Sequence, residues 1–260
     1  MRRILALESA TEGLSVALLE GERVVVLREH AEARQHSALL LAVVDETLRE
    51  AGVALGELDA MAITAGPGSF TSLRIGLATL KGLAFGRDLP VVGVSTLETM
   101  ALRVLESGRE DGRERARAGA TAGTEVLGLL DARRGEWYAG AWRAADAPGS
   151  VPDATLVEGL YAPEQLAQDL PRSVIAVSPE AAGWRDPFER AGLRIAGWVE
   201  GAEARPRADW VGRLAARRLA RGEGQSASTL SARYLRRAEA EARRMGSAVE
   251  EGETERIEGA

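Results

Sequence analysis

The sequence predicts an α/β protein built from two related halves. Two stretches carry this prediction, ILALESATEGLSVALL near the start and VLGLLDARRGEWYAGAW near the middle, and each reads as an apolar strand, a polar turn and a second apolar strand. After each hairpin, segments with helical spacing alternate with short apolar strands, which is typical of a sheet covered by helices. A hairpin that opens both halves indicates a duplicated architecture.

The elements of the first half follow from apolar spacing and turn chemistry. Short apolar runs bounded by turn residues predict strands at Arg3–Glu8, Leu14–Leu19, Arg23–Arg28, Ala60–Ala65 and Leu89–Val94. Apolar residues spaced three and four apart predict helices at Arg34–Ala51, at Thr71–Phe85 and after Ser95. Gly52 ends the first helix, and the Ser95 hydroxyl is suited to cap the third.

The second half is separated from the first by a stretch without periodicity. Residues 108–124 are rich in Arg, Glu, Gly and Ala, which predicts an exposed linker. Beyond the second hairpin, strands are predicted at Ala154–Val157, Ser173–Val177 and Arg194–Val199, and helices after Pro163 and at Ala208–Arg221. The expected organisation is a first subdomain over 1–107, a second over 125–235, and an acidic tail over 236–260 that we expect to be disordered.

The composition narrows the possible chemistry. The chain has 260 residues, a formal net charge of −6 and a pI of about 5.3, so it lacks the bulk positive charge that drives nonspecific nucleic-acid binding. It has no cysteine, Lys81 is its only lysine, and His30 and His36 are its only histidines. Cysteine nucleophiles are excluded, and Schiff-base chemistry and a three-histidine metal site are disfavoured. We therefore predict no catalytic residue and no metal site.

The start of the chain does not resemble a targeting segment. Its basic beginning is followed by an apolar run that Glu8 interrupts. No apolar run approaches the roughly 20 residues that a membrane helix requires. We expect a cytoplasmic protein that makes no membrane contact.

The stretch TAGPGSFTSLRIG has the outline of a phosphate-binding loop but matches neither known motif. A P-loop needs a lysine beside its last Ser or Thr, and a dinucleotide fingerprint needs a third glycine where Thr71 stands. The simpler interpretation is a strand-to-helix turn with Thr71 as its cap. Nucleotide contact through free backbone amides stays open, with candidate cofactor residues Glu8, Gly66, Gly68, Ser69 and Thr71.

Two helices carry more apolar and small surface than one face can hide. In the predicted helix Thr71–Phe85, small residues recur on one stripe. Glycine inside a helix costs about 1 kcal/mol relative to alanine, so several glycines on one stripe suggest close approach of another helix. The predicted helix Arg34–Ala51 is apolar over more than one narrow face, which indicates burial on two sides. Packing within this chain and packing against a partner subunit are both open; the candidate partner-binding residues are Leu39, Leu40, Val43, Val44, Gly76, Thr79, Leu80, Gly82, Leu83 and Gly86.

The ordered motifs of the chain resemble those of the bacterial TsaB (YeaZ) family. They are ILALESATEGLSVAL, GPGSFTSLRIGLATLKGLA, VVGVSTLETMA and LLDARRGEWYAGAW, which reach from the start to about Trp142, and ARYLRR near Tyr234. The resemblance implies an actin-like, Hsp70-like ATPase fold in which two related subdomains each have a mixed sheet and flanking helices. It also implies that helices 34–51 and 71–85 form a bundle with the matching helices of the paralogue TsaD.

The resemblance further implies a scaffold role in tRNA modification. TsaD carries a metal-binding His-x-x-x-His motif and transfers a threonylcarbamoyl group to adenosine in tRNAs that read codons beginning with A; TsaB is its dimerisation partner, and the ATPase TsaE joins them. The present chain has no His-x-x-x-His motif. The implied partners are TsaD, TsaE and, through the complex, tRNA. No intrinsic cofactor is implied, and ATP or ADP at the subunit boundary is left open.

Two departures and two alternatives accompany this resemblance. Glu8-Ser9 stands where the family usually has Asp-Thr, and Ser72 stands where it has Gly. The first departure weakens nucleotide coordination by this chain alone. A stand-alone ATPase or kinase of the same fold is the alternative function, and a metallopeptidase is disfavoured by the missing motif. The sequence leaves open whether the isolated chain is a homodimer.

Overall fold

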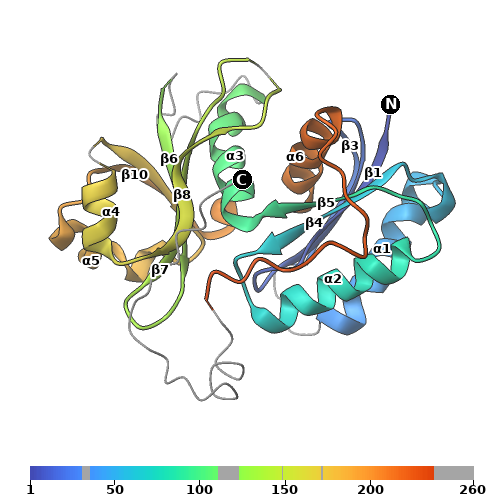
Figure 1. Ribbon diagram of the computed structural model, residues 1–260, viewed down its shortest axis with the longest axis horizontal. Helices are drawn as coiled ribbons and strands as arrows, with labels where there is room; N and C mark the ends of the chain where they lie inside the picture. The colour runs from blue at the N-terminus through green and yellow to red at the C-terminus, as the bar shows by residue number, and fades with distance from the viewer. Residues whose placement is uncertain (31–35, 111–122, 148, 171, 237–260) are drawn as a thin grey trace.

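The first subdomain is built on a five-stranded mixed sheet (Figure 1). The structure is a computed structural model, which describes residues 1–30, 36–110, 123–147, 149–170 and 172–236. In the order β3-β2-β1-β4-β5, the strands are Arg23–His30, Leu14–Glu20, Arg3–Glu8, Ala60–Gly66 and Val91–Ser95. The three strands β1 to β3 pair antiparallel, whereas β4 and β5 continue the sheet in parallel.

The second subdomain repeats this arrangement. In the order β8-β7-β6-β9-β10, its strands are Asp153–Tyr161, Trp137–Arg143, Glu125–Asp131, Val174–Ser178 and Ile195–Glu200. Again an antiparallel meander of three strands is extended by two parallel strands. Two sheets with the same strand order confirm the predicted duplication and the actin-like fold.

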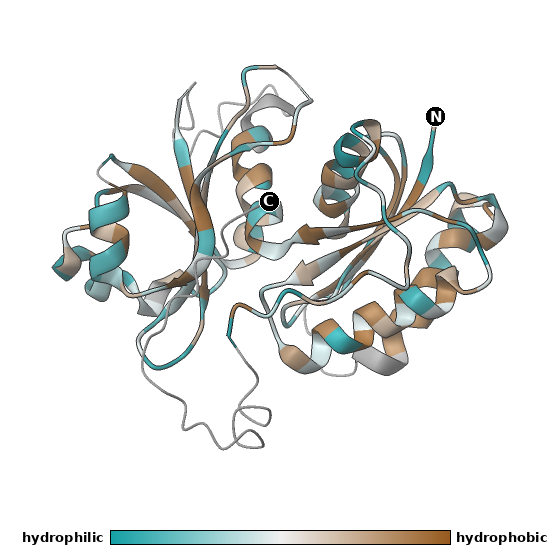
Figure 2. Cartoon of the chain, in the orientation of Figure 1, coloured by the Kyte–Doolittle hydropathy of each residue, from teal (hydrophilic) through white to brown (hydrophobic). Residues whose placement is uncertain are grey.

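Helices cover both faces of the first sheet. On one face lie α1 (His36–Ala51) and α2 (Phe70–Ala84), which pack against each other and enclose a core with Leu5, Leu7 and Ile63. On the opposite face lies α6 (Ala208–Ala220), where Trp210 and Leu214 pack on the other side of the same strands. The sheet between them is strongly hydrophobic, as the brown strands of Figure 2 show. Burial on both faces explains why the strands read as continuous apolar runs.

One helix joins the two subdomains. The N-terminal turn of α3 (Thr96–Glu110) lies against the second sheet, where a Cβ added to Gly128 would sit 3.1 Å from the Leu97 backbone oxygen. The same helix contacts α6 and the ends of β4 and β5. Two further helices, α4 (Pro163–Asp169) and α5 (Arg185–Ala191), cover the far face of the second sheet. Short 3-10 turns occupy Leu55–Glu57, Ala181–Gly183 and Gly201–Ala204.

The structure corrects the predicted subdomain boundaries. The helix α3 runs to Glu110, past the predicted end at residue 107. The larger error concerns the predicted second subdomain over 125–235, because α6 and the segment after it pack on the first subdomain. Chain order alone does not say on which sheet a returning helix lies. Most of the predicted linker (111–122) and nearly all of the predicted tail (237–260) fall outside the described residues.

In the described parts of the chain, no helix has both the length and the apolar character needed to cross a bilayer.

Candidate functional site

The glycine-containing loop between β4 and α2 is closed by its own contacts. Ser69 caps α2 by accepting a hydrogen bond from the Ser72 amide, and its own amide donates to the Ala10 carbonyl at 2.8 Å. Gly68 lies so close to the Ala10 carbonyl that a Cβ there would collide with it. Ser69, and not Thr71, is therefore the cap, and the predicted group of amides facing an anion is not present at Ser69 and Ser72.

Glu8 lies beneath this loop and is sealed from solvent, with only 1% of its surface exposed. One carboxylate oxygen accepts from the Ala10 amide at 3.0 Å, and the other accepts from the Thr64 hydroxyl. Burial raises the pKa of the Glu8 carboxyl to about 7, although these hydrogen bonds oppose the rise. Glu8 therefore organises the β1–β2 turn, and the structure does not bring it to a surface where it could touch a nucleotide.

The raised pKa of Glu8 predicts a pH-dependent stability. The unfolded carboxyl titrates near 4.5 and the folded one near 7, so between these values the folded state binds more protons. The free energy of unfolding is therefore expected to fall as pH rises from 5 to 8, by about 3 kcal/mol in total. Glu8→Gln should remove this component, because its amide does not titrate and the Thr64 hydroxyl can accept from it. Urea unfolding of both proteins across this range measures it; parallel profiles would contradict it.

A cleft of about 210 Å³ lies between the two subdomains. Three chain segments form its walls: the loop and first turn of α2, the β6–β7 hairpin, and the segment that ends the described chain. Its lining is rich in arginine and aromatic side chains: Pro67, Gly68, Phe70, Leu73, Ala132, Arg133, Arg134, Tyr138, Arg233, Tyr234, Leu235 and Arg236. Of the predicted cofactor residues, Gly68 alone belongs to this lining.

The β6–β7 hairpin places two strained arginines on the wall of the cleft. Arg133 and Arg134 both have positive φ, 69° and 60°. For residues other than glycine this backbone costs of order 1–3 kcal/mol each, and such strain concentrates at functional sites. Asp131 holds the turn by accepting from the Arg133 amide at 2.7 Å and pairing with its guanidinium at 3.1 Å. The Arg133 side chain is 84% exposed and is available to an anionic ligand.

The predicted partner-binding residues do not form one surface. Five of them lie in the core of the chain itself, so the prediction that they contact a partner is wrong for Leu40, Val43, Val44, Gly76 and Leu80. Leu39, Thr79 and Leu83 are partly buried, and Gly82 and Gly86 are exposed. Gly86 lies beyond the end of α2.

The geometry of a helix explains why the predicted glycine stripe divides. Steps of three residues turn by about 300°, so Gly76 and Gly82 point about 120° apart. Gly76 faces the sheet, where an added Cβ would collide with Ser9 and lie 2.9 Å from Ile63, whereas Gly82 has nothing within 4 Å of such a Cβ. Gly76 therefore allows α2 to approach the sheet closely, whereas Gly82 leaves open space on the solvent side of the same helix.

These two glycines give a matched prediction. Gly76→Val is expected to lower the free energy of unfolding by about 1–3 kcal/mol because it overpacks the α2–sheet contact. Gly82→Ala is expected to raise it by up to about 1 kcal/mol, since alanine is the better helix former and meets open space. Chemical unfolding of both variants measures the difference, and equal effects would contradict the assigned orientations.

The solvent-facing sides of α1 and α2 expose a different set of apolar and small residues. We call Leu41, Ala78, Gly82 and Phe85 the docking face. Ala78, Gly82 and Phe85 are spaced four and three apart and so share one side of α2. Leu41 is 53% exposed and Phe85 is 84% exposed, which is high for large apolar side chains. The sequence analysis did not select Leu41 or Phe85, because the spacing of apolar residues identifies an apolar helix but not which of its apolar side chains remain exposed to solvent.

Sequence reasoning also missed the arginines of the cleft. Arg133 and Arg134 were visible only as the polar part of a hairpin, and Arg233 and Arg236 as part of a closing motif. Their convergence depends on how the end of the chain returns to the first sheet. Among the described residues, no group of three or more His, Asp or Glu side chains is arranged to hold a metal ion.

One named relative and one solved structure are similar to this chain over nearly their whole length. The chain is 32% identical to the tRNA threonylcarbamoyladenosine biosynthesis protein TsaB of Escherichia coli, over 90% of this chain and 94% of that protein. It superposes on YeaZ from Pseudomonas aeruginosa with a TM-score of 0.73 and 32% identity, covering 90% of this chain and all of that one.

A more partial similarity connects the chain with TsaD. The family model for TsaD, tRNA N6-adenosine threonylcarbamoyltransferase, matches residues 29–167. The transferase of Geobacter is 38% identical over 117 residues, but the match spans only 34% of that enzyme. The match with TsaB of Escherichia coli, by contrast, covers 90% of this chain and 94% of that protein. Within this wider TsaD-related group, the chain belongs to the TsaB (YeaZ) family.

Proposed function

We propose that this protein is a non-catalytic subunit for N6-threonylcarbamoylation of adenosine in tRNA, and that it pairs with a TsaD-type catalytic paralogue. Its relatives in Escherichia coli and Bacillus subtilis are tRNA threonylcarbamoyladenosine biosynthesis proteins, which supports a place in this pathway. The observation that carries the pairing is the docking face, which this chain leaves uncovered on α1 and α2. An exposed phenylalanine beside a glycine suits a partner helix that approaches closely and buries the ring.

The scarcity of catalytic groups supports the non-catalytic part of the proposal. The chain has one lysine, two histidines and no cysteine. Glu8, a carboxyl whose pKa is raised to about 7 by burial, is sealed under the β1–β2 turn. The chemistry would then belong to the paralogue, with a TsaE-type ATPase as a further partner and tRNA as the substrate of the complex.

Reconstitution tests this proposal. The chain, a TsaD-type paralogue and a TsaE-type ATPase are combined with tRNA and threonylcarbamoyl-adenylate, and each protein is then omitted in turn. Modified adenosine is expected only when this chain and the paralogue are both present. Full transfer by this chain alone would overturn the non-catalytic assignment, and unchanged transfer in its absence would overturn the requirement.

The cleft supports a second proposal, that ATP or ADP binds at the boundary between this subunit and its partner. The same helix, α2, carries the docking face and supplies Phe70 and Leu73 to the cleft. Arginine guanidinium groups bind phosphate oxygens in a bidentate manner, and aromatic rings stack on bases. Calorimetry with the isolated chain and with the complex is the test: weak binding by the isolated chain and tighter binding by the complex are expected, whereas micromolar binding and turnover by the chain alone would favour a stand-alone ATPase.

A further inference from the structure

The end of the described chain is bound to the first subdomain over most of its length. After α6, residues 225–236 run across the first subdomain towards the second (Figure 1). Gln225 exchanges two backbone hydrogen bonds with Val91, of 2.8 and 2.9 Å, and Leu230 is buried in the core. The Arg233 amide donates to the Ala65 carbonyl at 2.7 Å. This segment is thus an additional strip along the first sheet.

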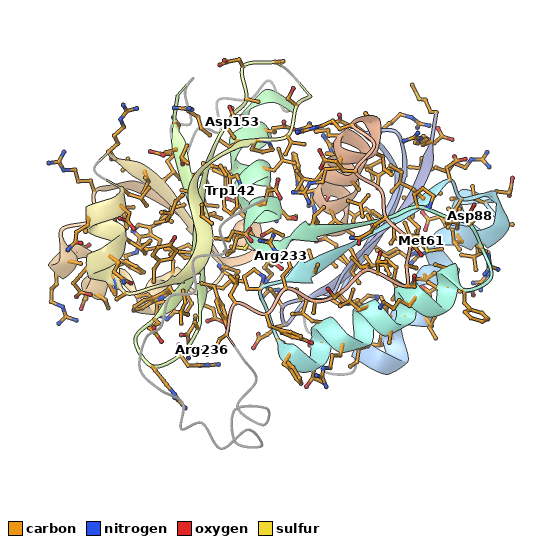
Figure 3. The ribbon with its side chains drawn as sticks, viewed as in Figure 1. Met61, Asp88, Trp142, Asp153, Arg233 and Arg236 are labelled. Atoms are coloured by element: carbon orange, nitrogen blue, oxygen red, sulfur yellow. The ribbon has the colours of Figure 1, made fainter. Side chains whose placement is uncertain are left out.

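Two of the last four residues of this segment, Arg233 and Arg236, contact the second subdomain. The Arg233 guanidinium pairs with Glu158 of β8 at 3.0 Å, and Figure 3 places Arg233 between the two sheets. Arg236 donates to the Ala132 carbonyl at 2.7 Å and pairs with Glu136, both in the β6–β7 hairpin. Residues 233–236 therefore connect the two sheets directly.

The Arg233–Glu158 pair is the costly part of this connection. The Glu158 side chain is only 7% exposed, and burial raises the pKa of its carboxyl despite the charge of Arg233. A buried carboxylate that loses its partner is strongly unfavourable unless it is rehydrated or protonated. Separation of the subdomains would rehydrate it, so loss of Arg233 alone favours the separated arrangement over the closed one.

The residues that make these connections also line the cleft. Arg233, Tyr234 and Arg236 border it together with Arg133 and Arg134 of the hairpin. Tyr234 is held in turn by the first turn of α2, through its ring contact with Phe70 at 5.2 Å. A phosphate-type oxyanion in this cleft would compete for the same guanidinium groups that now hold Glu158 and Glu136.

We propose that residues 233–236 are an interdomain tie, and that an oxyanion bound in the cleft releases it by drawing Arg233 and Arg236 from their carboxylates. The release step deepens the nucleotide proposal above, whereas the tie itself does not depend on it. The ligand shifts the equilibrium because it bonds better to the released state than to the tied one. Filling of the cleft and opening of the subdomains are then linked.

The tie is tested by a distance measured between the subdomains. The chain has no cysteine, so Gly56→Cys and Gly183→Cys, both at open positions, accept one spin label in each subdomain. Pulsed electron resonance of the full chain should give a narrow distance distribution. The double variant Arg233→Gln/Arg236→Gln should broaden this distance distribution and shift it. The charge reversal Arg233→Glu/Glu158→Arg keeps an ion pair between positions 233 and 158, so its distribution should stay narrow.

Controls keep the tie falsifiable. Arg221→Gln removes an exposed guanidinium beyond the end of α6 without touching the tie, so its distribution should match the wild type. If the double variant does not fold, Arg236→Gln alone removes the contacts with Ala132 and Glu136 and should still broaden the distribution. Wild-type distributions in the double variant and in Arg236→Gln would overturn the tie.

The release step has its own arm, with inorganic triphosphate as the probe. Saturating triphosphate should move the wild-type distribution towards that of the double variant. Calorimetric binding without a change of distance, or no binding at all, would overturn the release step. All arms use the isolated chain, so their failure is distinguishable from failure of the pairing proposal, which is read from the reconstituted complex.

Discussion

Replacing Gly82 with glutamate is expected to weaken association with a TsaD-type partner by at least about thirtyfold, while the chain itself stays folded. A glutamate at a buried interface position loses its hydration without gaining an opposite charge. Substitutions at central interface positions cost about 2 kcal/mol or more of binding free energy. Within the isolated chain, nothing lies within 4 Å of a Cβ at Gly82, so the side chain meets solvent. Pull-down and calorimetric titration with the partner measure the loss, and thermal melting checks the fold.

Gly183 provides the matched control for this substitution. It is an exposed glycine of the second subdomain, and a Cβ there also has nothing within 4 Å. Gly183→Glu adds the same charge and volume away from the docking face and should bind the partner normally. Equal affinities for the two variants would show that the docking face does not contact the partner, and unfolding of Gly82→Glu would show that α2 packs differently.

Arg217→Met is expected to lower the free energy of unfolding by about 3 kcal/mol. Arg217 of α6 is 6% exposed and donates to Glu22, Glu106 and the Ser150 carbonyl, with distances from 2.7 to 3.1 Å. Burial opposes its charge, but the bonds to Glu106 and Glu22 outweigh this and raise the pKa of Arg217. Its removal leaves two partly buried carboxylates without their cation where the subdomains meet. Urea unfolding at neutral pH measures the effect.

An exposed ion pair in the same region gives the comparison. Arg221 pairs with Glu223 at 2.8 Å just beyond the end of α6, and its side chain is 62% exposed. Because surface pairs contribute roughly 0–1 kcal/mol, Arg221→Met should change stability by less than 1 kcal/mol. A similar loss in both variants would mean that the Arg217 network is no stronger than a surface contact.

The fold could be predicted from the sequence because its signals are local. Each hairpin can be recognised within about 17 residues of sequence, and the spacing of the apolar residues distinguishes strands from helices. The side of the sheet on which α6 lies is not a local property, since it depends on contacts between Trp210 or Leu214 and strands some two hundred residues earlier. The predicted second subdomain therefore wrongly included it.

The candidate site was predictable only in part for a similar reason. The helices α1 and α2 were correctly identified as carrying excess apolar surface, but the outward residues Leu41 and Phe85 were not chosen. A repeat of small residues every three positions drifts around a helix, which is why Gly76 turned inward. Three distant segments form the cleft, and no spacing within one segment reveals that Arg133 and Arg233 line the same cleft.

The late return of α6 has a consequence for synthesis on the ribosome. One face of the first sheet is covered by α6, which begins more than a hundred residues after β5 ends. At roughly 5–20 residues per second, that face of the nascent chain stays bare for on the order of ten seconds. Translation intermediates of this protein thus present a long-lived apolar surface to chaperones, and a gene fragment that stops before Ala208 would encode an aggregation-prone protein.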